Sequence, residues 1–292
     1  MGMKNVLLGT AVVLAAYAPA HAADLAQRPV YKAPPPMLAQ APVFSWTGCY
    51  LGGHVGGGWG RKDINIPNLA TAAEIPPSEV TFAVPPVRDN TSGFVGGGQV
   101  GCDYQFAGNW VLGVEGEGSG SGIRGDVTPP PVVFNNPPGG PFPPGPVPIT
   151  STFHAQTDWL ASITGRLGYA AGPWLIYAKG GVAWAGDKYG ADIPIFGGEH
   201  LSASETRTGW TVGGGVEWAF LTNWSAKVEY DFYDFGTRTV SLTGIFPGGG
   251  PSTIPTGAVA VPGVDIRQTM SVVKFGINYR FGSVGAPVTA SY

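Results

Sequence analysis

Charged residues are scarce in this chain. Asp, Glu, Lys and Arg make up 12% of the 292 residues, and the formal net charge is −3. The 16 basic residues are scattered rather than grouped, so no segment offers the basic surface that nucleic-acid phosphates require. We therefore expect no nucleic-acid partner.

Long apolar runs and cysteines are scarce as well. After residue 23 no run of 18 apolar residues occurs, which excludes a membrane protein built from helices. The two cysteines are too few for a zinc site without histidine support. A soluble periplasmic fold and a membrane β-barrel remain as alternatives.

Glycine, proline and aromatic residues are abundant. The 47 glycines and 28 prolines alone are typical of a disordered chain. The 9 Trp, 11 Tyr and 14 Phe argue against disorder, because a chain that stays solvated seldom carries so much aromatic surface. An apolar environment is expected to receive these rings.

The first 22 residues have the pattern of an export signal. Lys4 supplies the positive charge, residues 6–17 are apolar, and residues 20–22 (Ala-His-Ala) form a small-residue cleavage site. We expect cleavage before Ala23. Residues 23–44, rich in Pro and Ala without a sustained period, are expected to form a periplasmic linker.

Eight later segments alternate between apolar and polar residues as β-strands do, and none of them contains a proline. They lie at about 46–60, 91–106, 110–121, 155–170, 174–187, 207–220, 224–236 and 267–281. Tight turns are expected at 107–109, 171–173 and 221–223, and long loops at 61–90, 122–154, 188–206 and 237–266. The Pro-rich stretch 129–148 is the extreme case of a poorly ordered loop.

This order of short and long connections is typical of outer-membrane barrels, whose turns face the periplasm and whose loops face outside. The sequence therefore predicts an all-β fold: an eight-stranded antiparallel up-and-down transmembrane β-barrel with short periplasmic turns and four long extracellular loops. The barrel is expected at residues 45–282, with a C-terminal tail at 283–292.

The last two strands show which face is apolar. In the final strand, Val273, Phe275 and Ile277 alternate with Lys274 and polar neighbours. A soluble sandwich also shows such alternation. The nine tryptophans favour the membrane, because all lie near predicted strand ends and so form two interfacial girdles. They are Trp46, Trp110, Trp174, Trp218 and Trp224 toward the short turns, and Trp59, Trp159, Trp184 and Trp210 toward the long loops.

With these features, the sequence resembles the small outer-membrane β-barrel proteins of alphaproteobacteria known as porin-family or outer-membrane immunogenic proteins. The matching stretches are DLAQRPVYKAPPP at 24–36, FSWTGCYLGGHVGGGWG at 44–60, SGFVGGGQVGCDYQFAGNWVLGVEGEG at 92–118, ITGRLGYAAGPWLIYAKGGVAW at 163–184 and VVKFGINYRFG at 272–282. The resemblance implies an outer-membrane location, an envelope-structural or surface-antigen role and, in some relatives, haem binding. Many outer-membrane barrels end the chain on an aromatic residue of the last strand, whereas here eleven residues follow Phe281. The assembly machinery is therefore expected to recognise either the last strand or Tyr292.

Charged faces that point inward would give the barrel a lumen with both signs of charge. An eight-stranded barrel is only wide enough for side chains, so a packed ion-pair network is expected rather than a channel. Lys274 and Arg280 are expected to meet Glu229 and Asp231 of the preceding strand. The lumenal set is Asp103, Glu115, Glu117, Arg166, Lys179, Glu217, Lys227, Glu229, Asp231, Lys274 and Arg280.

The patterns that suggest catalysis or a cofactor have simpler explanations. Glu115 and Glu117 are two residues apart, so they merely share a strand face. The sequence Gly96-x-Gly98-x-x-Gly101 matches the dinucleotide-binding pattern, but it lies inside a strand instead of at a strand-to-helix turn. We expect no catalytic residue, cofactor or metal.

A lipid-modifying barrel enzyme is the remaining enzyme hypothesis. It needs a lipid-facing pair of serine and histidine, and the mature chain has only His54, His154 and His200. No serine lies in a G-x-S-x-G elbow. The sequence does not reveal such a pair.

Cys49 and Cys102 lie on the outer face of the first two predicted strands, which could place them opposite one another. Because the periplasm is oxidising, a disulfide is the leading interpretation. Two inert, lipid-facing thiols are the alternative.

Three functions remain: an envelope-structural and surface-exposed protein, a narrow pore for small solutes, and a receptor whose loops bind haem or a host ligand. We favour the first, since eight strands leave little room for conduction. Outer-membrane lipid and the assembly machinery are the expected partners, with a possible surface ligand at the long loops.

Overall fold

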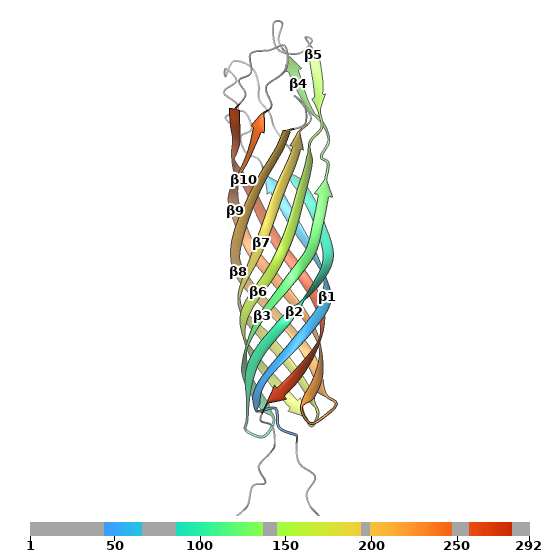
Figure 1. Cartoon of the computed structure of the whole chain (residues 1–292), viewed down its shortest axis with the longest axis vertical. Coiled ribbons are helices and arrows are strands. Elements are labelled where there is room, and N and C mark those ends of the chain that lie inside the picture. Colours follow the sequence, from blue (N-terminus) through green and yellow to red (C-terminus); the bar gives the residue numbers. More distant parts are fainter. Residues whose placement is uncertain (1–43, 66–85, 137–144, 194–198, 247–256, 282–292) are drawn as a thin grey trace, which may run out of the picture. The chain divides into compact units, whose positions relative to one another are not determined.

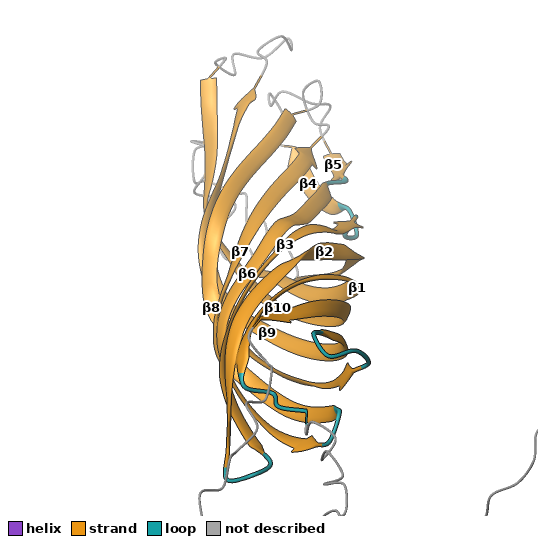
Figure 2. Cartoon of the chain, turned by 60° about the horizontal axis from the view of Figure 1, so that its bottom comes forward, coloured by secondary structure: helices purple, strands orange, loops and turns teal. Residues whose placement is uncertain are grey.

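The computed structural model describes residues 44–65, 86–136, 145–193, 199–246 and 257–281. The predicted signal segment at 1–22, the linker up to residue 43 and the tail at 283–292 lie outside these residues. In the described residues no helix is long and apolar enough to cross a membrane, and Figure 2 shows strands and loops only. The strands are β1 (Gly48–Asn65), β2 (Val87–Phe106), β3 (Trp110–Val127), β4 (Val132–Asn136), β5 (Gly145–Ile149), β6 (Thr152–Ala171), β7 (Trp174–Ile193), β8 (Glu199–Ala219), β9 (Trp224–Phe246) and β10 (Gly257–Phe281).

Eight of the strands close into an antiparallel barrel in the order β1-β10-β9-β8-β7-β6-β3-β2. Consecutive strands of the chain pair with each other, except that β3 pairs with β6 and skips β4 and β5, and β10 pairs with β1 to complete the ring (Figure 1). The predicted eight-stranded antiparallel barrel is thus confirmed. The predicted loop between β3 and β6 contains an additional hairpin, β4–β5, where the Pro-rich sequence led us to expect no order.

The pairing registers fix how narrow the barrel is. A row of paired residues that starts at Cys49 on β1 passes around the ring and returns to β1 at Trp59, ten residues further along. A shear of this size tilts the strands, and eight strands leave an interior that side chains can fill.

The strands continue beyond their predicted ends on the side opposite the short turns. The connection between β7 and β8 comprises residues 194–198, and the connection between β9 and β10 comprises residues 247–256. The sequence had suggested loops at 188–206 and 237–266. These two connections are therefore shorter than predicted, and the sheet extends past the aromatic girdle.

Along the longer strands the apolar side chains change from the outer face to the inner face of the barrel, as in β6. In its membrane half, Ile163 and Leu167 are exposed on the outer face, whereas Arg166 is buried in the lumen. Beyond the girdle Phe153 is buried inside, and Gln156 lies on the outer face. The outer end of the barrel therefore has an apolar interior and a polar exterior, which is the arrangement expected in water.

Prolines do occur in strands of the structure. Pro262 lies in β10 at an irregularity where Val261 pairs with Leu242 and Val264 with Val240, so that one extra residue bulges from β10. Pro146 and Pro148 lie in β5, a strand of the two-stranded hairpin. Bulges and edge strands tolerate a residue that cannot donate a backbone hydrogen bond.

The tryptophans form the two predicted girdles with one exception. Seven are exposed on the outer surface: Trp110, Trp174, Trp218 and Trp224 near the short turns, and Trp59, Trp159 and Trp210 near the other end. Trp184 is partly buried. Trp46, in contrast, is fully buried, so its predicted place in the interfacial girdle is wrong.

Candidate functional site

A cluster of three lysines and four carboxylates fills the middle of the lumen. Lys179 Nζ lies 2.6 Å from Glu229 Oε1 and 3.1 Å from Glu115 Oε1. Lys227 Nζ contacts the same two carboxylates, at 3.0 Å from Glu115 Oε2 and 3.2 Å from Glu229 Oε2. Each carboxylate thus receives two ammonium groups from different strands, which offsets part of the cost of removing these charges from water.

Lys274 connects this cluster to two further carboxylates. Its Nζ lies 2.6 Å from Glu117 Oε2, 2.5 Å from Asp231 Oδ2 and 3.1 Å from Glu229 Oε1. All of these side chains are buried. The structure therefore places seven of the predicted lumenal residues in one network that spans β3, β7, β9 and β10.

A second group of charges lies toward the short turns. Arg166 contacts Asp103 through two nitrogen atoms, one of which, Nε, is 2.7 Å from Oδ1. Its Nη1 lies 3.2 Å from Glu217 Oε2. Arg280 Nη1 lies 2.9 Å from Asp103 Oδ2, and Arg280 Nη2 lies 3.8 Å from Glu217 Oε1. Two arginines thus share two carboxylates across the lumen.

The expected partners are correct for Lys274 and wrong for Arg280. Lys274 contacts both Glu229 and Asp231. Arg280 contacts Asp103 and Glu217 instead. Six residues of extended chain separate Arg280 from Lys274, a distance of about 20 Å, so the two basic groups meet different layers of the lumen.

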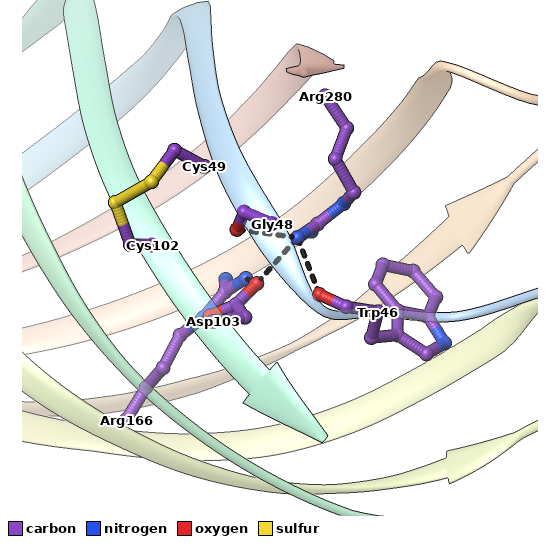
Figure 3. The surroundings of a disulfide bond; sticks show 7 residues. All are labelled: Trp46, Gly48, Cys49, Cys102, Asp103, Arg166 and Arg280. Carbon is purple, nitrogen blue, oxygen red and sulfur yellow. Dashed lines mark hydrogen bonds and ion pairs between the residues drawn. A yellow bond between two sulfur atoms is a disulfide. The ribbon is translucent and has the colours of Figure 1, made fainter. Parts of the chain in front are cut away.

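Trp46 closes the lumen at the short-turn end (Figure 3). Its carbonyl oxygen accepts a hydrogen bond from Arg280 Nη1 at 2.7 Å, and its backbone nitrogen donates to Gln105 Oε1 at 2.9 Å. The indole Nε1 donates to the carbonyl oxygen of Gly172 in the β6–β7 turn, and the Arg280 guanidinium lies 5.1 Å from the indole centroid. Trp46, two residues before β1, therefore lies inside the barrel mouth.

A third charged group, absent from our sequence-based set, lies beyond the girdle. Lys62 Nζ is 3.1 Å from Asp187 Oδ1, and Arg207 Nε is 3.7 Å from Asp187 Oδ2. Arg207 Nη1 also donates to the carbonyl oxygen of Ile266 at 2.9 Å. The alternation could have revealed these residues. Lys62, for example, is an even number of residues from His54 on β1, so both side chains are on the inward face.

Glu115, Glu117 and Glu229 each offer an oxygen within 4.8 Å of the others. The same carboxylates accept hydrogen bonds from Lys179, and Lys227 and Lys274 provide further ones. Since the three ammonium groups already supply positive charge to these oxygens, the geometry suits an ion-pair network. Nothing in it prepares one of the carboxylates to act as an acid and another as a base.

One serine–histidine contact occurs in the described lumen. His54 Nε2 lies 2.7 Å from Ser119 Oγ, and its Nδ1 lies 2.6 Å from Gln99 Oε1. Gln99 Nε2 continues the chain to Asn278 Oδ1 at 2.7 Å. Both His54 and Ser119 are buried inside the barrel, so this pair does not face lipid as a lipid-modifying enzyme would require.

Cys49 and Cys102 form a disulfide in the structure, at a sequence separation of 53. They are directly paired residues of β1 and β2, and both face outward near the short turns. Figure 3 shows the bond beside Gly48 and Asp103, on the other side of the wall from the Arg166 group. The bond joins the two strands that flank the first long connection.

The closed antiparallel ring, its apolar outer band and the two aromatic girdles define an integral outer-membrane β-barrel protein. The family model of the outer membrane protein beta-barrel domain matches residues 8–281. The chain belongs to this family, which confirms the resemblance seen in the sequence.

Several known proteins are similar to the chain over most of its length. The 31 kDa outer-membrane immunogenic protein of Brucella melitensis is 27% identical over 288 residues, 96% of this chain and 100% of the relative. The 25 kDa outer-membrane immunogenic protein of Brucella abortus is 25% identical over 243 residues, which cover 83% and 89% of the two chains. The solved structure of the outer membrane protein OprG from Pseudomonas aeruginosa covers 82% of this chain and 100% of its own, with 12% identity and a TM-score of 0.34.

Proposed function

We propose that this protein is a sealed outer-membrane barrel that supports the envelope structurally and displays a polar surface outside the cell. The observation that carries the proposal is the filled lumen. Charged side chains from several strands meet inside it at hydrogen-bonding distances, and Trp46 is buried at its periplasmic mouth.

Successive layers of the lumen oppose the passage of solutes. Between the lysine network around Lys274 and the Lys62 group lies an apolar cluster that includes Val95, Ile123, Leu160, Tyr233 and Met270. A second apolar cluster lies beyond the Lys62 group and includes Ile64, Phe153 and Ile266. A hydrated ion would have to separate paired charges and also cross packed apolar side chains, each step at a cost in free energy. These layers favour a structural role over the narrow pore.

The surface role rests on the outer part of the strands and on the relatives. Beyond the girdle the outer face is polar, as a surface in water requires. Two of the relatives are themselves described as outer-membrane immunogenic proteins. An antigen- or adhesion-type role fits both facts, and a receptor that binds haem or a host ligand is the alternative. The inward direction of the His54–Ser119 pair favours a protein without enzymatic activity.

Export and assembly complete the proposal. A cleavable signal at residues 1–22 would direct the chain across the inner membrane, and the outer-membrane assembly machinery would insert the barrel. Outer-membrane lipid would then surround the apolar band that includes Leu51, Val55 and Phe275.

Single cysteines tested on intact cells will show the topology. Ser204→Cys lies on the outer face of β8 beyond Trp210, and Leu221→Cys lies in the β8–β9 turn. A membrane-impermeant thiol reagent should label the first in intact cells and the second only after the outer membrane is permeabilised. Liposomes containing the protein should also fail to swell in small sugars. Swelling at the rate of a known porin would contradict the sealed lumen.

A further inference from the structure

Two arginines lie on the outer face just beyond the extracellular girdle. Arg61 follows Trp59 by two residues on β1, so both side chains are on the same face. Arg124 on β3 pairs with Ser92 on β2, which in turn pairs with Trp59. The two arginines therefore lie on either side of β2. Their backbones are about 12 Å apart, because two strand spacings of about 4.8 Å separate them across the sheet and a two-residue offset separates them along the strands.

The register places the two arginines at nearly the same height above the membrane. Arg61 is two residues along a tilted strand from Trp59, a rise of about 5 Å. A row of paired residues that is followed once around the eight strands ends ten residues further along its starting strand. The height above the membrane therefore increases by about 3 Å from each strand to the next. Arg124, two strands along the row from Trp59, therefore also lies about 6 Å above it. Interfacial indoles sit at the level of the headgroups, so both guanidinium groups lie at headgroup height or just above it.

Most other outward-facing basic groups in this region are neutralised by carboxylates. Arg88 Nε is 2.9 Å from Asp63 Oδ1, and Lys188 Nζ is 2.7 Å from Asp158 Oδ2. Asp126, two residues from Arg124, contacts His154 instead. Within the described part of the chain, neither Arg61 nor Arg124 has an ion-pair partner.

The surface between the two arginines is polar. Asn90 pairs with Arg61 and Ser92 pairs with Arg124, and both side chains are exposed on the outer face of β2. An amide and a hydroxyl can each donate a hydrogen bond, and guanidinium groups bind phosphate in a bidentate manner. Four donor side chains from three adjacent strands thus surround one position above the membrane.

We propose that Arg61 and Arg124, with Asn90 and Ser92 between them, bind a phosphate group of a phosphorylated glycolipid in the outer leaflet. The position of the site argues for a lipid as the source of the phosphate. Trp59 lies directly beneath Arg61 on the lipid-facing side of the wall and is exposed there, where the acyl chains and sugar of such a lipid would pack. The unpaired charge of the two arginines is complementary to the phosphate.

The test measures lipid retention by the full-length refolded protein. Wild type is placed in nanodiscs of phosphatidylcholine that contain diphosphorylated lipid A, and bound lipid A is counted by native mass spectrometry. A basic residue at a membrane surface contributes about 1 kcal/mol to anion binding, or about a fivefold change in affinity. Arg61→Gln and Arg124→Gln should each reduce affinity about fivefold, and the double variant about 25-fold. Heat-modifiable gel mobility will show that each variant is folded.

Arg88→Gln is the matched control, because Arg88 is exposed on the same surface but is paired with Asp63. It should change affinity less than twofold. With wild-type protein, dephosphorylated lipid A should bind as weakly as diphosphorylated lipid A binds to the double variant. The proposal is overturned if the double variant keeps wild-type affinity, if Arg88→Gln loses as much as Arg61→Gln, or if phosphatidylglycerol binds as tightly as lipid A.

Discussion

Lys179 on β7 reaches past β8 to Glu229 on β9, with its Nζ 2.6 Å from Oε1. Glu229 also lies within 3.2 Å of Lys227 and 3.1 Å of Lys274. One buried carboxylate therefore receives three ammonium groups from three strands. The contacts of Glu229 with these lysines link β7, β9 and β10 on one side of the barrel.

Glu229→Leu should destabilise the barrel more than Glu229→Leu combined with Lys179→Met. The single change leaves buried lysines without their shared carboxylate, and an orphaned buried charge costs on the order of 3–5 kcal/mol. The double change removes a positive charge as well and should recover much of that loss. Denaturant unfolding in lipid vesicles will measure both free energies.

Asp158→Asn is the control for this comparison, because Asp158 forms a more exposed pair with Lys188 on the outer surface. Such pairs contribute less than about 1 kcal/mol. If Glu229→Leu is as stable as wild type, Glu229 is hydrated, and the lumen is wetter than its packing indicates.

Loss of the Cys49–Cys102 bond should lower stability. The bond closes a loop of 53 positions, for which chain entropy gives a stabilisation of about 4 kcal/mol at most. Replacement of both cysteines by serine should lower the free energy of unfolding by about 2–4 kcal/mol, and reduction of the wild type should do the same. Mass spectrometry of a non-reduced digest will test the bond itself, and two free thiols in the native protein would contradict it.

Trp46→Ala should destabilise the barrel although Trp46 lies outside every strand. Its side chain is fully buried and stacks with Arg280, and removal of a buried Trp side chain costs about 3–5 kcal/mol. Trp224→Ala, in the exposed girdle, removes the same ring from the lipid interface and should cost less. Equal losses in the two variants would place Trp46 at the interface instead of in the lumen.

His154 should titrate above the usual range of histidine. Hydrogen bonds to Asp126 (Nδ1 to Oδ1, 2.6 Å) and Asp192 (Nε2 to Oδ2, 2.9 Å) raise the pKa of His154. The contribution to stability is therefore fully present below the unfolded pKa of about 6.5 and is lost as the pH rises through the folded pKa. An NMR titration of the imidazole in micelles will measure this pKa, and Asp126→Asn should lower it. An unchanged pKa in that variant would show that the contact with Asp126 does not form.

The membrane half of the barrel could be predicted because apolar and polar residues alternate there with a period of two, and the apolar residues always face outward. Lys227, Glu229 and Asp231 all follow from that rule, since each lies between apolar neighbours on β9. Their partners on other strands depend on register, which the turns constrain only between adjacent strands. Arg280 illustrates the limit, because its partner Asp103 lies on β2, with β1 between the two strands.

The outer half could not be predicted by the same rule, because polarity reverses beyond the girdle. The register of β6 also shifts between Thr157 and Trp159, so that the inward residues change from odd to even positions. Asp187 and Arg207, by contrast, lie on the same inward face of β7 and β8 as Lys179 and Glu217, so the alternation could have revealed them at the ends of the two predicted strands. Trp46 was misplaced for a different reason: it lies on the same inward face as Tyr50 and His54, but its position at a predicted strand end led us to assign it to the girdle.

The central claim is that the lumen is sealed, and single-channel recording in planar lipid bilayers tests it most directly. Wild-type protein refolded and inserted at neutral pH in potassium chloride should give no stepwise conductance, because paired charges and apolar layers fill the interior. A known porin inserted under the same conditions provides the positive control. Reproducible conductance steps from folded wild-type protein, verified by heat-modifiable mobility, would contradict the account and show that ions pass through this lumen.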